Sequence, residues 1–78
     1  MPTILVVEGF RFFFFSNEGN EPPHIHVEKA DAYAKFWLTP VALSYAEGFK
    51  RAERRRMHEL VESNARLFRE RWNEYFGS

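Results

Sequence analysis

The spacing of apolar residues changes at Gly48, and this change limits what the chain can fold into. Before Gly48, apolar and polar residues largely alternate with the period of two that β-strands require. After it, apolar residues recur every three or four positions, as on one face of an α-helix. Because the two periods occupy separate parts of the chain, we expect an α+β fold. It consists of an antiparallel sheet of four or five strands with one long C-terminal helix packed on one face.

Turn residues divide the first part of the chain into strands. The expected strands cover residues 3–8, 10–15, 24–28 and 33–38. Residues 41–45 form either a fifth strand or a short helical piece, and we favour the strand. Residues 16–23 form a loop whose end is stiffened by two consecutive prolines.

A single helix is expected to cover most of residues 51–75. Glu53 is placed to bond back to the start of this helix, although Lys50 is a poor cap residue. Asn64 interrupts the apolar stripe, and Gly77 is a natural stop. The stripe predicted to pack on the sheet consists of Met57, Leu60, Val61, Phe68, Trp72, Tyr75 and Phe76.

The chain has 78 residues, which predicts a single domain over residues 1–78. It has no cysteine, so neither disulfides nor thiolate metal sites can stabilise it. Nine Phe, three Tyr and two Trp are many rings for one small core. We therefore expect some rings to face a partner, either another protein or a second copy of the chain.

Neither a membrane-spanning apolar run nor an export signal is recognisable, so we expect a cytoplasmic protein without a membrane partner. Charge is unevenly distributed. Residues 1–49 hold three basic and six acidic groups, whereas residues 50–78 hold eight basic and five acidic groups. The basic second part makes an anionic partner such as nucleic acid possible.

Strand alternation sorts the central residues into two faces. One face should pack on the helix and carries Ile25, Val27, Ala34, Phe36 and Leu38. The opposite face should carry His24, His26, Glu28, Tyr33, Lys35 and Trp37, joined by Arg11, Phe13 and Phe15. A single helix covers only one face, so this second face is the candidate site.

The two histidines allow three interpretations. His24 and His26 could act as acid and base in phosphodiester cleavage, with Lys35 or Arg11 holding the phosphate. They could ligate a metal with Glu28, His58 or another carboxylate as third ligand. They could also be structural, bonding to neighbouring strands or to the proline loop. We favour the structural interpretation and expect no metal and no cofactor.

Nucleic-acid binding has its own candidate residues. Tyr33 and Trp37 beside the cation Lys35 could stack on the bases of single-stranded nucleic acid, with Arg11 as a further basic residue of this site. Arg54, Arg55 and Arg56 could contact phosphates. The alternatives are cross-strand packing for the rings and a solvated helix face for the arginines, and we favour both alternatives.

The segment Pro22-Pro23-His24-Ile25-His26-Val27 is distinctive, and further motifs lie in residues 1–4, 8–11, 16–18, 34–38 and 72–76. Together these segments resemble a known bacterial family, the domain-of-unknown-function 4160 family. The sequence departs from the family pattern at Lys50, where a small polar cap is expected, and in the unusually basic run of residues 54–56.

The resemblance implies a small bacterial protein, often encoded beside a second small protein. That arrangement suggests one half of a two-protein, toxin–antitoxin-like system. We therefore predict an interaction module that binds a small protein encoded nearby, forms a homo-oligomer, or does both. The alternative is a small endoribonuclease or nucleic-acid-binding protein that uses the sheet face of His24 and His26.

Overall fold

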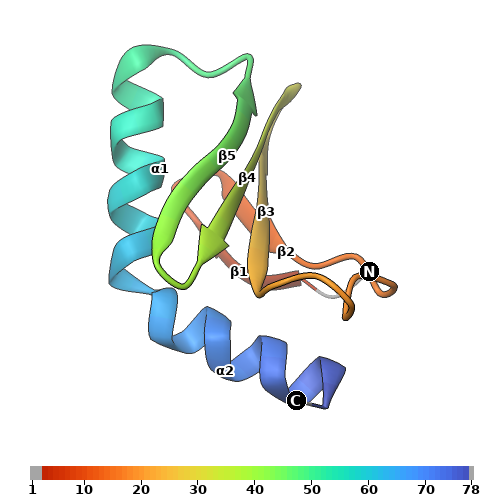
Figure 1. Ribbon diagram of the computed structural model, residues 1–78. Helices are drawn as coiled ribbons and strands as arrows, with labels where there is room; N and C mark the ends of the chain where they lie inside the picture. Colours follow the sequence, from red (N-terminus) through yellow and green to blue (C-terminus); the bar gives the residue numbers. More distant parts are fainter. Residues whose placement is uncertain (1–2, 78) are drawn as a thin grey trace.

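The computed structural model describes residues 3–77, which form one sheet and two helices (Figure 1). In chain order the elements are β1 (Thr3–Val7), β2 (Phe10–Phe13), β3 (His24–Lys29), β4 (Ala32–Leu38), β5 (Val41–Glu47), α1 (Arg51–Ser63) and α2 (Ala65–Phe76). The predicted α+β class is confirmed.

The five strands form an antiparallel meander in the order β1-β2-β3-β4-β5. Residues 41–47 are a strand, as favoured from the sequence. Glu8 and Gly9 connect β1 to β2 with φ angles of 53° and 84°. Two positive φ angles are the requirement of a tight hairpin turn whose twist matches that of its strands.

The prediction of one long helix over most of residues 51–75 is met only in part, because Asn64 divides the helical region into two helices. Asn64 has φ −112° and ψ 11°, outside the α-helical range. Its side-chain amide donates to the Leu60 carbonyl at 2.9 Å, and the same carbonyl accepts the Asn64 backbone N–H at 3.1 Å, so both groups of Asn64 close the last turn of α1. α2 therefore leaves in a new direction and passes below the end of the sheet (Figure 1).

α1 packs on one face of the sheet, and α2 extends this layer past the end of the sheet (Figure 1). The five strand residues predicted to face the helix are all buried in the core, and so are Phe10, Phe12 and Phe14. α1 and α2 add Met57, Leu60, Val61, Phe68 and Trp72. Phe76 packs against this cluster, whereas Tyr75 is 47% exposed and so departs from the predicted stripe.

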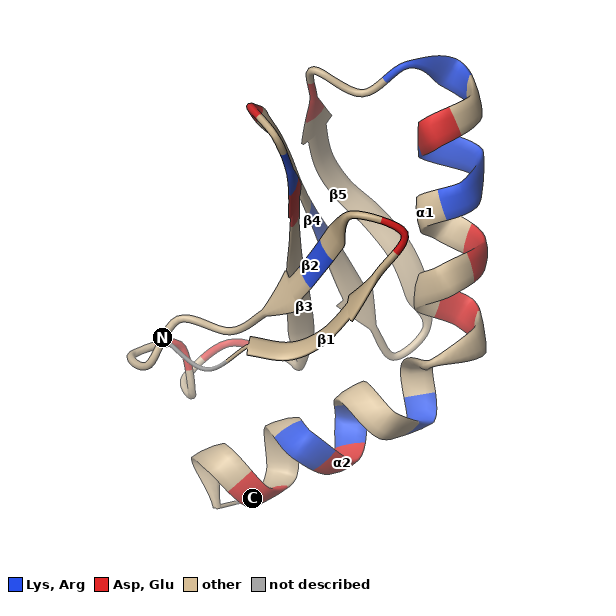
Figure 2. Cartoon of the chain, turned by 180° about the vertical axis from the view of Figure 1, so that it is seen from behind, with Lys and Arg blue, Asp and Glu red and all other residues tan. Residues whose placement is uncertain are grey.

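The start of α1 carries most of the basic charge of that helix (Figure 2). Although Lys50 is a poor cap, the Glu53 carboxylate accepts a hydrogen bond from its backbone N–H at 2.9 Å. Arg56 reaches across to the β1–β2 turn, where it contacts the Glu8 carboxylate at 2.6 Å. The Arg56–Glu8 contact joins α1 to the first hairpin.

Candidate functional site

The register of β3 and β4 sets the candidate site. His24 pairs with Trp37, His26 with Lys35, and Glu28 with Tyr33. The hairpin thus keeps the parity of both strands, and these six side chains share the face opposite the helices.

The β2–β3 loop, residues 14–23, folds back over part of this face. Glu18 organises the loop, because its carboxylate accepts a bond from the Phe15 N–H at 3.2 Å and its carbonyl accepts one from the Glu21 N–H at 3.1 Å. Gly19 lies so close to Phe76 of α2 that an added Cβ would be 2.7 Å from the ring. The C-terminal helix therefore helps to position the loop.

Glu18 meets both histidines beneath this loop. Its Oε1 lies 2.7 Å from Nε2 of His26 and 3.0 Å from Nε2 of His24. His24 is 0% exposed, His26 is 3% exposed, and the Glu18 side chain is 15% exposed. We call these three residues the Glu18 triad.

The other ring nitrogen of each histidine also has a partner. Nδ1 of His24 lies 2.9 Å from the Pro22 carbonyl oxygen. Nδ1 of His26 lies 2.6 Å from the Tyr33 hydroxyl oxygen. By contrast, the contact of His24 Nε2 with Glu18 lacks hydrogen-bond geometry, and this buried nitrogen has no other hydrogen-bond partner within residues 3–77.

Burial and the carboxylate shift the pKa values of the triad in different ways. Burial lowers the pKa of His26, and the opposing contact with Glu18 only partly offsets it. Burial alone would raise the pKa of Glu18, but the contacts with His26 and His24 hold it below its usual value. The pKa of Tyr33 is raised, chiefly by burial and then by the Glu18 charge.

Lys35 and Arg11, the predicted phosphate-binding residues, are both engaged in ion pairs. Lys35 Nζ lies 3.0 Å from Glu21 Oε1 and 4.4 Å from the centre of the Trp37 ring. Arg11 makes two hydrogen bonds to one oxygen of Glu28, at 2.8 and 3.0 Å. The predicted catalytic residues are therefore neighbours, but the loop covers the imidazoles.

Arg54, Arg55 and Arg56 are not brought to this site. They lie on α1, which packs on the other face of the sheet, and all three are exposed. Arg56 is additionally paired with Glu59 at 3.2 Å. The two parts of the predicted nucleic-acid surface thus lie on opposite sides of the sheet.

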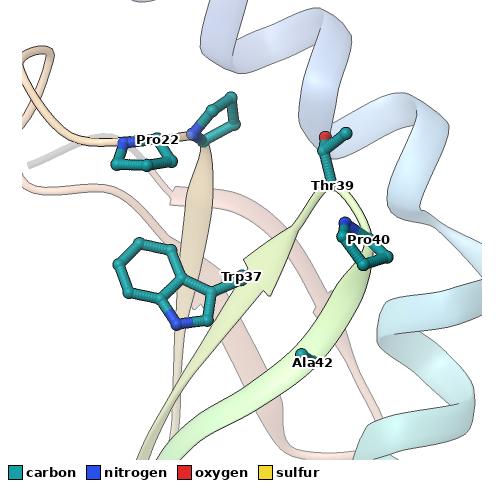
Figure 3. Close-up of a pocket in the computed structure, with 6 residues that line it drawn as sticks. Pro22, Trp37, Thr39, Pro40 and Ala42 are labelled. Atoms are coloured by element: carbon teal, nitrogen blue, oxygen red, sulfur yellow. The ribbon is translucent and has the colours of Figure 1, made fainter.

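An apolar pocket lies beside the triad, where the β4–β5 turn meets the end of the loop (Figure 3). Its volume is about 280 Å³. The indole of Trp37 forms one wall, with Pro22 at its end and Pro40 and Ala42 across from it (Figure 3). The lining residues are Pro22, Pro23, Trp37, Thr39, Pro40 and Ala42.

Sequence reasoning identified the stiff Pro22-Pro23 segment but missed the role of Glu18 and the pocket. Glu18 lies in a loop without periodicity, so no pattern placed its carboxylate against the histidines. One signal was available: Glu18 and the two histidines lie close together in the sequence, on either side of two stiff prolines. A short loop that folds back over the following strand brings such residues together.

In the described part of the chain, neither helix is long and apolar enough to cross a membrane. No curated protein and no solved structure matches the sequence. A family does match, over residues 9–73, and its description is "Domain of unknown function (DUF4160)". This match covers most of the chain, including the Glu18 triad and the pocket, so the chain belongs to the DUF4160 family.

Proposed function

We propose that this chain is a protein-interaction module, one half of a two-protein bacterial system, and that its pocket receives an apolar side chain of the partner. The observation that carries this proposal is the pocket between Trp37 and the prolines, which is lined largely by apolar groups. Proline rings have little conformational freedom, so a partner residue enters a site whose walls are already formed.

The surroundings of the pocket favour a protein partner. Tyr45 of β5 is 48% exposed and pairs with Lys35, and Phe15 of the β2–β3 loop is 38% exposed and packs on His26, so both rings lie on the same face of the sheet as Trp37. Exposed rings that share a face with an apolar pocket are typical of the centres of protein interfaces. β5 is also an edge strand of the sheet, so its backbone can pair with an extended segment of the partner.

Charge near the pocket is already neutralised. Glu21 pairs with Lys35, and the Lys35 ammonium group lies over the Trp37 ring. A cation held in this way stiffens the indole rather than attracting a polyanion. A neutral apolar anchor therefore suits this site better than a phosphate does.

The endoribonuclease alternative requires imidazoles that reach a phosphodiester. His24 and His26 are 0% and 3% exposed, beneath the loop that carries Glu18. General acid–base catalysis needs contact with the reacting group, either direct or through one water molecule. The burial of the two rings favours the interaction module, and the catalytic assignment of His24, His26 and Lys35 stays a prediction.

The test is titration calorimetry of the chain with the small protein encoded beside it. Trp37→Ala should weaken the complex at least about 30-fold, corresponding to about 2 kcal/mol for a central aromatic anchor. Val6→Ala is the matched control, because Val6 is an apolar residue, 61% exposed, on the opposite edge strand β1. Circular dichroism verifies that both variants are folded.

Three results would contradict the proposal. Equal affinities of wild type and Trp37→Ala would remove the pocket from the interface. Light scattering that shows a Trp37-dependent homo-oligomer and no heterocomplex would make a second copy the occupant. Binding or cleavage of RNA that depends on His24 and His26, without a protein complex, would support the nuclease alternative.

A further inference from the structure

We propose that Glu18, His24 and His26 bind a divalent transition-metal ion of the Zn²⁺ class, which fastens the β2–β3 loop to the sheet. The proposal goes beyond partner binding, and it replaces the expectation of no metal. That expectation rested on few ligand types and absent thiolates, and it had not identified Glu18 as the third ligand.

The hydrogen bond of His24 Nδ1 determines which nitrogen of the ring carries the proton. The Pro22 carbonyl oxygen can only accept, so the nitrogen 2.9 Å away must carry a proton. A neutral His24 then has a lone pair on Nε2. Oε1 of Glu18 lies 3.0 Å from this nitrogen, although outside hydrogen-bond geometry.

Two electron-rich atoms thus face each other in a buried place. Within residues 3–77, no hydrogen bond satisfies His24 Nε2, although Glu18 Oε1 is only 3.0 Å away. Burying a polar atom without a partner costs free energy, and two acceptors in contact also repel each other. A cation between His24 and Glu18 removes both costs.

His26 can adopt the same arrangement. Its Nδ1 lies 2.6 Å from the Tyr33 hydroxyl, which can accept a hydrogen bond as well as donate one. With the proton on Nδ1, the lone pair of Nε2 points to Glu18 at 2.7 Å. Metal-binding histidines commonly donate their second ring N–H to a carbonyl or another acceptor in this way.

The dimensions of the triad suit a small ion. The three ligand atoms all lie within 4.8 Å of one another. Zinc binds nitrogen and oxygen at about 2.0–2.2 Å, which places its ligands about 3.0–3.5 Å apart. Glu18 would withdraw by a few tenths of an ångström and the imidazoles would approach each other, so only the side chains need to move.

The ligand set also indicates the class of ion and its role. Two imidazoles and one carboxylate suit zinc and its neighbours better than magnesium or calcium, which prefer oxygen. The three side chains are nearly closed to solvent, and a water molecule would take the fourth position of a tetrahedral ion. A bound ion would join the loop to β3 through Glu18 on one side and both histidines on the other.

The experiment is titration calorimetry of the chelator-treated full chain with ZnCl₂ and with CoCl₂. We expect one ion per chain, together with a rise in melting temperature. Glu18→Gln and His24→Ala should abolish this binding. Tyr33→Phe should weaken it about 10–100-fold, because it removes only the acceptor that orients His26.

His58→Ala is the matched control, because His58 is another histidine beside a glutamate, 3.7 Å from Glu62, but on the exposed surface of α1. It should bind zinc as wild type does. Equal affinities for wild type and Glu18→Gln, or a loss of binding in His58→Ala alone, would overturn the proposal.

Nitrogen-15 NMR of the ring nitrogens shows whether Nε2 binds a metal ion or carries a proton, and it needs no variant. With zinc present, Nδ1 of His24 and of His26 should carry a proton and Nε2 of each should not. If Nε2 of His24 keeps a proton with excess zinc, a second proton on that ring holds the triad together and the metal site is refuted.

Discussion

Gly19 offers a sharp test of how the β2–β3 loop is held against the helices. A Cβ at this position would lie 2.7 Å from Cδ1 of Phe76 and 3.3 Å from its Cγ. Real Cβ atoms do not approach a ring this closely, so Gly19→Ala must displace either the loop or the ring. The ring is itself confined, because its centre lies 4.2 Å from that of Trp72 in the core.

The expected cost is that of overpacking a well-filled contact, about 1–3 kcal/mol. Gly19 does not have a positive φ, so alanine brings no backbone strain of its own. Without the clash, Gly→Ala stabilises the folded protein by about 0.4–1 kcal/mol, because the unfolded alanine variant has fewer conformations than the unfolded wild type. The sign of the effect therefore depends on Phe76 alone.

A double-mutant cycle in urea measures this dependence. Gly19→Ala alone should lower the free energy of unfolding by about 1–3 kcal/mol, which corresponds to a fall in melting temperature of about 4–20 °C in a domain of this size. In a Phe76→Ala background the same change should be neutral or slightly stabilising. Additive effects of the two substitutions would refute the close approach of the loop to α2.

Three further predictions concern stability. Gly9→Ala should lower the free energy of unfolding in urea by about 1–2 kcal/mol, because Gly9 has φ +84° and alanine is strained in this conformation. Phe68→Ala should cost about 3–5 kcal/mol, enough to remove the NMR dispersion of so small a domain, because its ring is fully buried against Phe12. The pKa of Glu8 is lowered, chiefly by its bond to Arg56, so the stability it contributes is present above its ordinary pKa of 4.5 and is lost as pH falls below that value. Between about pH 6 and pH 3, the melting temperature of Glu8→Gln should therefore fall by less than that of the wild type.

The part of the fold that follows from local rules was predictable. Successive strand residues point to opposite faces, so alternation alone assigns the side chains of His24, His26 and Trp37 to one face. The short turn between β3 and β4 preserves that parity. The composition of the sheet face follows from these two facts.

The end of α1 was harder to predict, because two effects compete at Asn64. The apolar stripe continues beyond it, which favours one continuous helix. The asparagine side chain, however, bonds to the carbonyl of Leu60 and ends the helix there. The break lets α2 place Trp72 against His24, with ring centres 4.7 Å apart, and this tertiary contact is absent from any local pattern.

Glu18 was missed for a related reason. Its position depends on a loop whose path is set by its contact with α2 and by the two prolines before β3. Neither constraint has a sequence period. Residues that complete a site from a loop are therefore found from the folded arrangement, whereas residues that project from a strand can be found from alternation.

Pro22 and Pro23 connect the two proposals physically. The Pro22 carbonyl accepts the Nδ1–H of His24, while the Pro22 ring lines the pocket beside Trp37. The Pro23 carbonyl accepts a bond from the Leu38 N–H, which joins the same segment to the end of β4. An ion that holds His24 in place would also hold one wall of the pocket. Because coupling between two sites is reciprocal, a partner in the pocket would then raise the affinity for the ion by the same factor by which the ion raises the affinity for the partner.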